Sequence, residues 1–246
     1  MAKTAPLMGG PASPPDCLLC PTRKRAEWSV LTDEEMTELS TAKSTRSYQK
    51  SEYVYNQGQP CTGLYCIASG TAALRRAESQ LPTVLVRLAF AGQTLGYRNC
   101  LGDASCTTSA KVLEPGMICH IEMPVLQRAL RRSRALQGRF QEHLATDLDA
   151  AEAAMAHVAW LPVRSRVARL ILELVEHNGS SRVGDTLVVA LPMTRRDMAE
   201  LLCTRPETLT RTMAAMEADG LLHNSGHRVA IANESGLRQE AQAHIR

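Results

Sequence analysis

The chain has 246 residues, a formal net charge of +3 and 44% hydrophobic residues. This length accommodates one large domain or two ordinary ones with a core each, and so small a charge does not by itself indicate a nucleic-acid partner. No run of eighteen apolar residues occurs and no apolar segment follows the first lysine, so the sequence predicts a cytoplasmic protein with no membrane partner and no signal peptide.

The N-terminal region combines a tail with a cysteine pair. Residues 1–16 are rich in proline, glycine, alanine and serine, which predicts a disordered tail. Cys17 and Cys20 form a Cys-x-x-Cys pair ahead of a basic run, and Thr32 can cap a helix in LTDEEMTELS. Because the cytosol is reducing, the eight cysteines of the chain favour metal binding, redox chemistry or burial over structural disulfides. The pair supplies half of a four-ligand metal or cluster site.

Residues 47–123 alternate between short apolar runs and glycine turns. The pattern predicts several antiparallel strands in a sandwich or roll, with a hairpin turn at Glu114-Pro115-Gly116. Residues 124–161 then form one long helical region, in which apolar residues recur every three or four positions with a break near Ser133. This stripe is typical either of a coiled-coil-like dimer seam or of a helix that packs on its own domain. Pro162 ends the helix.

The stretch from Met193 to Leu222 predicts two short amphipathic helices joined by a tight turn at Cys203-Thr204-Arg205. Thr194 can cap the first helix together with Asp197. Gly220 ends the second helix, and two apolar runs flank Ser225-Gly226 as a hairpin wing. This is the pattern of a winged helix-turn-helix, and the alternative is a helical hairpin with a solvated face.

Polar residues at the start of the second helix suit DNA recognition. A carboxylate can accept a hydrogen bond from the cytosine amino group, and an arginine can donate two to guanine. We therefore expect base contacts from Glu207, Thr210 and Arg211. We expect phosphate contacts from Arg195, Arg196, Arg205 and Thr208.

These motifs resemble the CRP/FNR superfamily of bacterial transcription regulators. Glu207-x-x-Thr210-Arg211 is similar to the E-x-x-S-R signature of the FNR branch, and Pro206 stands where cyclic-AMP receptor proteins have another arginine. Val54 to Gly58 and Leu64 to Gly70 resemble the framework of the superfamily's sensory β-roll.

The resemblance implies an α+β fold with a cyclic-nucleotide-binding-like β-roll, a long dimerisation helix and a C-terminal winged helix-turn-helix domain. The corresponding regions are the tail at 1–16, the roll with its cysteine motif at 17–124, the helix at 125–161 and the DNA-binding domain at 162–246. It also implies a homodimer that binds palindromic double-stranded DNA and works with RNA polymerase. The expected dimer contacts are Phe140, Leu144, Leu148, Ala151 and Met155.

Cyclic-nucleotide binders of this superfamily carry a Gly-Glu-Leu-Gly segment for the ribose and an Arg-Ser pair for the phosphate. The corresponding residues here are Gly96-Tyr97-Arg98-Asn99 and about Cys106-Thr107. With neither the glutamate nor the phosphate-binding arginine present, we expect no cyclic nucleotide as ligand.

The cysteines resemble the ligand set of FNR-type iron–sulfur regulators. Cys17, Cys20 and Cys119 match three ligands of a cluster, which the resemblance implies to be of the 4Fe–4S type, whereas Trp28 stands at the family's third N-terminal cysteine. The fourth ligand is then Cys100 or Cys106. Cys106 falls several residues along from the expected cross-strand partner of Cys119, which favours Cys100. We expect Cys61, Cys66 and Cys203 to be inert thiols, as most free cysteines are.

The resulting prediction is a homodimeric, sequence-specific regulator that senses oxygen or redox state, with half-sites like TTGAT rather than TGTGA. Two other sensors remain open within the same fold, a cluster-free thiol switch and a different small ligand such as haem. A thiol oxidoreductase based on Cys17 and Cys20 would need the pair at a helix start after a strand. Because the pair follows a proline-rich tail instead, we predict that the protein is not an enzyme.

Overall fold

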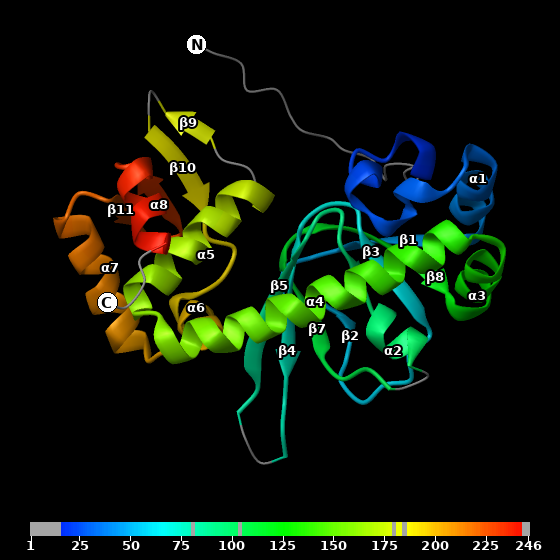
Figure 1. Cartoon of the computed structure of the whole chain (residues 1–246), viewed down its shortest axis with the longest axis horizontal. Helices are drawn as coiled ribbons and strands as arrows, with labels where there is room; N and C mark the ends of the chain where they lie inside the picture. The colour runs from blue at the N-terminus through cyan, green and yellow to red at the C-terminus, as the bar shows by residue number, and fades with distance from the viewer. Residues whose placement is uncertain (1–15, 80–81, 103–104, 179–180, 184–185, 243–246) are drawn as a thin grey trace, which may run out of the picture.

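The computed structural model describes residues 16–79, 82–102, 105–178, 181–183 and 186–242. Within these residues the chain folds into an N-terminal β-roll and a C-terminal helical domain with a small sheet, joined along one side by a long helix (Figure 1). The mixed α+β class with a roll, a long helix and a helix-turn-helix is confirmed. The tail predicted at 1–16 lies outside the described residues, apart from Asp16.

Short helical turns and one helix precede the roll. They are η1 (Cys17–Leu19), η2 (Arg23–Arg25), η3 (Glu27–Val30) and α1 (Asp33–Ala42). The start of α1 follows the sequence prediction, because the Thr32 hydroxyl accepts a hydrogen bond from the Glu35 amide and the Glu35 carboxylate accepts one from Thr32. Asp16 caps η1 in a similar way, through the amide of Leu18.

The strands of the roll form two antiparallel sheets within the described residues, in the orders β1-β8-β3-β6 and β2-β7-β4-β5. Their bounds are β1 (Ser44–Tyr48), β2 (Tyr53–Tyr55), β3 (Gly63–Ile67), β4 (Thr71–Arg76), β5 (Val84–Phe90), β6 (Thr94–Leu95), β7 (Ser109–Glu114) and β8 (Gly116–Glu122). The predicted hairpin at Glu114-Pro115-Gly116 is corrected in one respect. The chain turns there, but β7 and β8 belong to different sheets and do not pair.

The N-terminal segment covers one face of the first sheet. Leu64 and Cys66 on β3 lie directly opposite Ile121 and Cys119 on β8, so these four side chains share a face. Trp28, Met36 and Leu39 of the N-terminal segment belong to the same apolar core as Leu64 and Ile121. The face that carries Cys66 and Cys119 therefore lies beneath the segment that carries Cys17 and Cys20.

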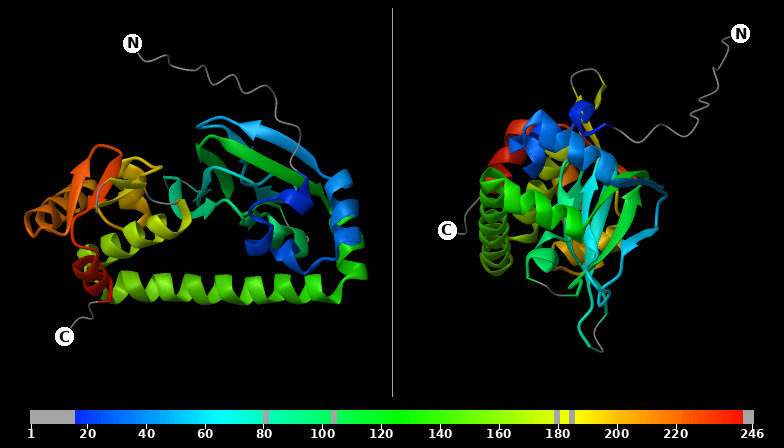
Figure 2. Two further views of the ribbon diagram at one scale, coloured as in Figure 1. Left: turned by 90° about the horizontal axis from the view of Figure 1, so that it is seen from above. Right: turned by 90° about the vertical axis from the view of Figure 1, so that its right-hand side faces the viewer.

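Three further helices lie between or after the strands of the roll. They are α2 (Tyr97–Leu101), between β6 and β7, and α3 (Met123–Arg132) and α4 (Arg134–Trp160), after β8. The predicted break at Ser133 is confirmed, because this residue separates α3 from α4 and caps the latter. Helix α4 runs along one edge of the molecule from the roll to the C-terminal domain (Figure 2). None of the helices in the described ranges is both long and apolar enough to cross a membrane.

The C-terminal domain begins directly after Pro162, where the sequence predicts the end of the long helix. Its elements are α5 (Val163–Asn178), β9 (Ser181–Val183), β10 (Thr186–Ala190), α6 (Arg195–Leu201), α7 (Pro206–Ala218), β11 (Leu222–Ser225), β12 (Arg228–Ile231) and α8 (Glu234–Gln242). The strands pair in the order β11-β12-β10-β9. The hairpin of β11 and β12 turns at Gly226, which has a positive φ of 59°, as the wing prediction requires.

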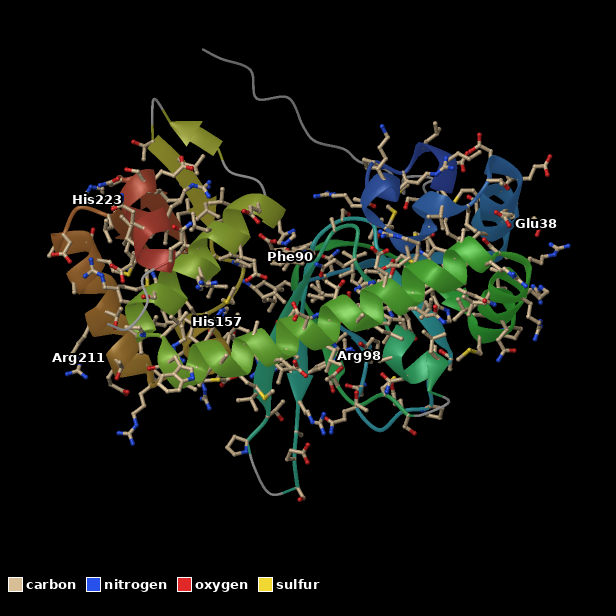
Figure 3. The ribbon with its side chains drawn as sticks, viewed as in Figure 1. Glu38, Phe90, Arg98, His157, Arg211 and His223 are labelled. Carbon is tan, nitrogen blue, oxygen red and sulfur yellow. The ribbon has the colours of Figure 1, made fainter. Side chains whose placement is uncertain are left out.

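The roll packs against the C-terminal domain. Leu85, Leu88 and Phe90 of the roll belong to the same apolar core as the buried residues of α5, α6 and α7. The Phe90 ring stacks on His177 of α5 at 4.6 Å between centroids, in the region where the two domains meet (Figure 3). One continuous core therefore spans the two domains.

Candidate functional site

The helix-turn-helix is built by local signals. The Thr194 hydroxyl accepts a hydrogen bond from the Asp197 amide, and the Asp197 carboxylate accepts one from the Thr194 amide, which fixes the start of α6. The turn after α6 contains Cys203 with a φ of 48°, and Arg205 is the N-cap residue of α7. Pro206 occupies the first turn of α7, where its missing N–H costs no hydrogen bond. The predicted turn at Cys203-Thr204-Arg205 is confirmed.

Helix α7 has one buried and one exposed face. Leu209, Met213 and Met216 are buried in the core of the domain. Glu207, Thr210 and Arg211 are all exposed, and Arg211 extends away from the body of the molecule (Figure 3). The Thr210 hydroxyl donates a hydrogen bond to the carbonyl of Pro206 at 2.9 Å, so its methyl group is the part free to contact a base. The three expected base-reading residues thus lie together on the first two turns of α7.

The expected phosphate contacts divide into two groups. Arg196, in the first turn of α6, keeps 80% of its side chain exposed while it pairs with Glu200 at 3.4 Å. At the start of α7, Arg205 is exposed and Thr208 is partly buried. Arg195 instead turns inward, where it donates hydrogen bonds to Asn224 of the wing and to the carbonyl of Gly226. Burial lowers the pKa of its guanidinium group. In this conformation Arg195 ties the wing to α6, so its predicted phosphate contact would require these hydrogen bonds to break.

A cysteine-lined pocket lies between the N-terminal segment and the first sheet. Cys17, Cys20, Cys66 and Cys119 line this cavity of ≈ 50 Å³ together with Trp28. Burial raises the pKa of the Cys17 thiol, against an opposing effect of the Lys43 ammonium, and burial also raises the pKa of Cys66. The Cys17 and Cys66 thiols are therefore largely protonated near neutral pH. Three of them match the ligands expected from the sequence.

Hydrogen bonds hold this pocket in its present form. The Trp28 indole donates from Nε1 to Cys66 Sγ at 3.1 Å, and Thr45 donates to Cys119 Sγ at 3.5 Å. The Cys17 amide donates to the Ser40 hydroxyl at 3.1 Å. In the part of the chain that the structure describes, no three His, Cys, Asp or Glu side chains converge closely enough to hold a single metal ion.

The two expected fourth ligands lie apart from the other three. Cys100 and Cys106 do not line the pocket, whereas Cys66, expected to be an inert thiol, does. Cys100 belongs to α2, and its Sγ lies 2.8 Å from Cys61 Sγ. The reason is the pairing of β3 with β8, which sets Cys66 opposite Cys119. The sequence indicates that Leu64 and Cys66 share one face of their strand, and that Cys119 and Ile121 share one face of theirs. It does not indicate that these two strands pair with each other.

A buried polar network connects the pocket to α4. Glu27, next to Trp28 and 5% exposed, accepts hydrogen bonds from Thr94 at 2.5 Å and from Nδ1 of His143 on α4. Burial acts to raise the pKa of Glu27, but these hydrogen bonds hold that pKa below its ordinary value of 4.5. The sequence contains no local signal for this network, because its members are far apart along the chain.

The same network continues one turn along α4. Asp147 accepts hydrogen bonds from Arg87 at 2.6 Å, from Arg98 at 2.8 Å and from the hydroxyl of Tyr97. Tyr97 and Arg98 belong to α2, and Arg87 to β5. The N-terminal segment, α2 and the second sheet are therefore all attached to the first half of α4.

The expected dimer contacts on α4 separate into buried and exposed residues. Phe140 is 1% exposed and packs edge-on against Trp28, so it belongs to the core of its own roll and is removed from the interface prediction. Leu144 packs partly against the same core. Leu148 and Met155 are 62% and 67% exposed, and Ala151 between them is exposed as well. At intervals of three and four residues, these exposed side chains form one row along the helix.

Two family models match the chain. The model of a cyclic nucleotide-binding domain matches residues 45–133, which cover most of the roll, and the model of a Crp-like helix-turn-helix domain matches residues 165–240. The first range contains Cys66 and Cys119 of the pocket, and the second contains α6, α7 and the wing.

Relatives of known function match over most of the chain. The transcriptional activator protein FnrL of Cereibacter sphaeroides is 24% identical over 233 residues, covering 92% of this chain and 91% of that protein. The fumarate and nitrate reduction regulatory protein of Escherichia coli K12 is 22% identical and covers 86% of this chain and 84% of its own. The structure of FixK2 from Bradyrhizobium japonicum superimposes with a TM-score of 0.71 at 21% identity, over 82% of this chain and 99% of that one.

Proposed function

Because the chain belongs to the CRP/FNR superfamily of transcription regulators, we propose that it is a homodimeric, cytoplasmic regulator that senses oxygen or redox state through an iron–sulfur cluster in its cysteine pocket. DNA binding through the helix-turn-helix is the part of this function that its relatives share. The nature of the sensor and the dimer are our proposal.

One observation carries the sensor assignment. Cys17, Cys20, Cys66 and Cys119 line a single pocket, and four cysteine thiolates are the usual ligand set of a 4Fe–4S cluster. A cluster binds one thiolate at each of several irons, so its ligands need not converge on one point as they do around a single ion. Cys66 would supply the thiolate that Trp28 cannot. The donor set therefore fits the cluster in kind and in number.

The lining of the pocket indicates which part of the chain responds. Trp28 forms part of its wall and donates a hydrogen bond to Cys66 Sγ, so this thiol is engaged by the indole. Cys66 and Cys119 lie on paired strands, whereas Cys17 and Cys20 lie in short turns and are partly exposed. The η1 segment and Trp28 would therefore have to shift to admit the group, while the strands stay fixed. Oxygen-labile redox chemistry is what the cluster would supply.

Residues of this chain can pass such a shift to α4. Trp28 bonds to Cys66, its neighbour Glu27 bonds to His143, and His143 lies one turn before Asp147 on the same helix. Movement of Trp28 would disturb Glu27 directly, and Glu27 is 5% exposed with few alternative partners. This is a switch by local reordering of a segment.

The DNA-bound form would be a symmetric dimer. Two α7 helices related by a two-fold axis must enter successive major grooves, so the operator would be palindromic with half-sites about 34 Å apart. Exposed Glu207, Thr210 and Arg211 would read bases, with half-sites like TTGAT. Arg196, Arg205 and Thr208 would hold phosphates, and RNA polymerase would be the protein partner on DNA.

Iron and acid-labile sulfide analysis of anaerobically purified variants tests the sensor. We expect an iron–sulfur absorption spectrum in the wild type and its loss in Cys17→Ser, Cys66→Ser and Cys119→Ser. Cys100→Ser is the matched control, because Cys100 is also a roll cysteine but does not line the pocket. Iron kept in Cys66→Ser and lost in Cys100→Ser would overturn our ligand set.

The ultraviolet–visible spectrum also separates the other sensors. A haem would give its own intense absorption band and would survive the Cys17→Ser substitution. A wild-type preparation with neither iron nor haem, made under strict anaerobiosis, would contradict the cluster and leave a thiol switch as the function of the pocket.

A further inference from the structure

A second group of cysteines lies outside the four-cysteine pocket, where α2 packs beside the loop before β3. Cys61 Sγ and Cys100 Sγ are 2.8 Å apart, between the end of the loop before β3 and the body of α2. Two sulfur atoms at this separation are closer than two hydrogen-bonded thiols need to be and about 0.8 Å from the 2.05 Å length of a disulfide bond. The chain therefore already holds the two thiols nearly in bonding position, although they are 39 residues apart.

The surrounding backbone fixes this approach. Cys100 Sγ donates to the carbonyl of Gly63 at 3.1 Å, and Cys61 Sγ lies 3.6 Å from the carbonyls of Gly63 and Gly96. Gly96 has a φ of +86°, and a Cβ there would come within 3.0 Å of the Gly63 carbonyl. The absence of a side chain at Gly96 thus lets the start of α2 approach the start of β3 closely enough for the two thiols to meet.

We propose that Cys61 and Cys100 form a reversible disulfide, so that this pair is a thiol redox site separate from the four-cysteine pocket. Cys61 is partly exposed and acts as the attacking thiol, whereas Cys100 is 9% exposed and acts as the resolving thiol. Disulfides that form in the cytosol are transient and regulatory in character, which suits a pair that is free in the resting protein.

The reaction needs an oxidant, and a low-molecular-weight disulfide such as oxidised glutathione provides it. The Cys61 thiolate attacks one sulfur of the oxidant and releases one small thiol, which leaves a mixed disulfide on Cys61. The Cys100 sulfur, after loss of its proton, attacks Cys61 Sγ and releases the second small thiol. Two protein thiols lose two electrons and two protons in total, and the oxidant is reduced to two thiols.

A bridge at this place would act on α2. Tyr97 and Arg98 of α2 both donate hydrogen bonds to Asp147 of α4, directly after Gly96. A covalent bond from Cys100 to the loop before β3 would restrict α2 and hence this contact. Cys106 is the nearest alternative partner, because it interacts with Cys61, and burial raises the pKa of its thiol to about 11.

Peptide mapping of the full-length protein tests the proposal. The reduced protein is incubated anaerobically with oxidised glutathione, quenched in acid, alkylated and cleaved with chymotrypsin. Cleavage after Tyr65 and Leu101 separates Cys61 from Cys66 and Cys100 from Cys106. We expect a cross-linked peptide pair that contains Cys61 and Cys100, lacks two hydrogen atoms and is lost on treatment with dithiothreitol.

Matched variants complete the experiment. Cys61→Ser, at a partly exposed position, should abolish the cross-link, while Cys106→Ser and the exposed Cys203→Ser should keep it. Amide hydrogen exchange in α2 should slow in the oxidised wild type and stay unchanged in Cys61→Ser. A Cys61–Cys106 cross-link, or glutathione left on Cys61 with Cys100 alkylated, would overturn the assignment, and unchanged exchange in a bridged protein would overturn the effect on α2. Iron content is an independent readout, and it should not change in Cys61→Ser.

Discussion

Arg211 and Arg196 differ in what their side chains can reach. Arg211 lies on the exposed face of the first turns of α7, and Arg196 lies on α6 with 80% of its side chain exposed. We expect Arg211→Ala to weaken operator binding by about 1–3 kcal/mol and to relax the preference for one base pair. Arg196→Ala should weaken binding to all sequences alike. It should also reduce the slope of the logarithm of the binding constant against the logarithm of salt concentration by about 1. Fluorescence anisotropy on the operator and on single-base variants distinguishes the two effects, and an equal, sequence-independent loss from both substitutions would contradict base reading by Arg211.

Glu27 is the residue that joins the N-terminal segment to α4. Its folded-state pKa is below the ordinary value of 4.5, so its contribution to stability is complete above that pH and is lost as the pH falls through the lower folded-state pKa. Glu27→Gln removes the charge that His143 and Thr94 bind, which should lower the free energy of unfolding by about 1–3 kcal/mol near pH 7. The variant should also lose less stability than the wild type between about pH 5 and pH 3.

Urea unfolding at a series of pH values measures this difference. Glu34→Gln, at an exposed position of α1, is the control and should follow the wild-type curve. Parallel curves for Glu27→Gln and the wild type below pH 5 would show that the Glu27 carboxylate has no depressed pKa.

At the scale of an element, the second half of α4 presents an apolar row that stays exposed among the residues that the structure describes. Leu148, Met155 and Val158 are 62%, 67% and 42% exposed. If this row is the dimer interface, Leu148→Arg places two unpaired charges at a two-fold axis and should cost about 3–5 kcal/mol of association. Sedimentation velocity should then give monomers that no longer bind the operator. Thr146→Arg, exposed on α4 outside the row, should remain dimeric, and an intact dimer in both Leu148→Arg and Met155→Arg would move the interface elsewhere.

At the scale of the whole molecule, Arg75 links the roll to the DNA-binding domain. From β4 it donates to Asp197 at 2.7 Å and to Glu200 at 2.6 Å, both on α6, and all three side chains are less than a fifth exposed. Burial acts to raise the pKa of Asp197, but hydrogen bonds from Thr194 and Arg75 lower it. The Asp197 carboxylate is therefore charged at neutral pH, and the guanidinium group of Arg75 balances it.

Arg75→Ala removes the cation from Asp197 and leaves Glu200 with its 3.4 Å contact to Arg196. A fully buried pair broken in this way costs about 3–5 kcal/mol, and partial exposure should reduce the loss here to about 1–3 kcal/mol. We expect faster proteolysis near Leu161-Pro162, where the two domains join, and faster amide exchange in α6. Arg76→Ala, on the next residue and paired with exposed Glu78, is the control. Exchange in α6 that matches the wild type would mean that the apolar core alone holds the domains together.

Local chemistry explains what the sequence by itself determined. The capping boxes at Thr32 and Thr194, the helix break at Ser133, the turn at Cys203 and the wing at Gly226 all depend on groups within a few residues of one another. Such short-range hydrogen bonds and side-chain periods can be predicted from the order of the residues alone. The two faces of α7 follow from the same period, so its exposed polar residues could be predicted together with its buried methionines.

Only the tertiary structure decided which distant residues meet. Strand alternation predicts that Cys66 faces one side of a sheet, but the pairing of β3 with β8 brings it to Cys119, and the fold of α2 onto β3 brings Cys100 to Cys61 instead. The helical spacing of Phe140 is compatible with a dimer interface and equally with the core of its own domain. Its edge-on contact with Trp28 places it in that core. The physical reason is that strand pairing and helix docking are set by the summed burial of the whole domain, which no single segment encodes.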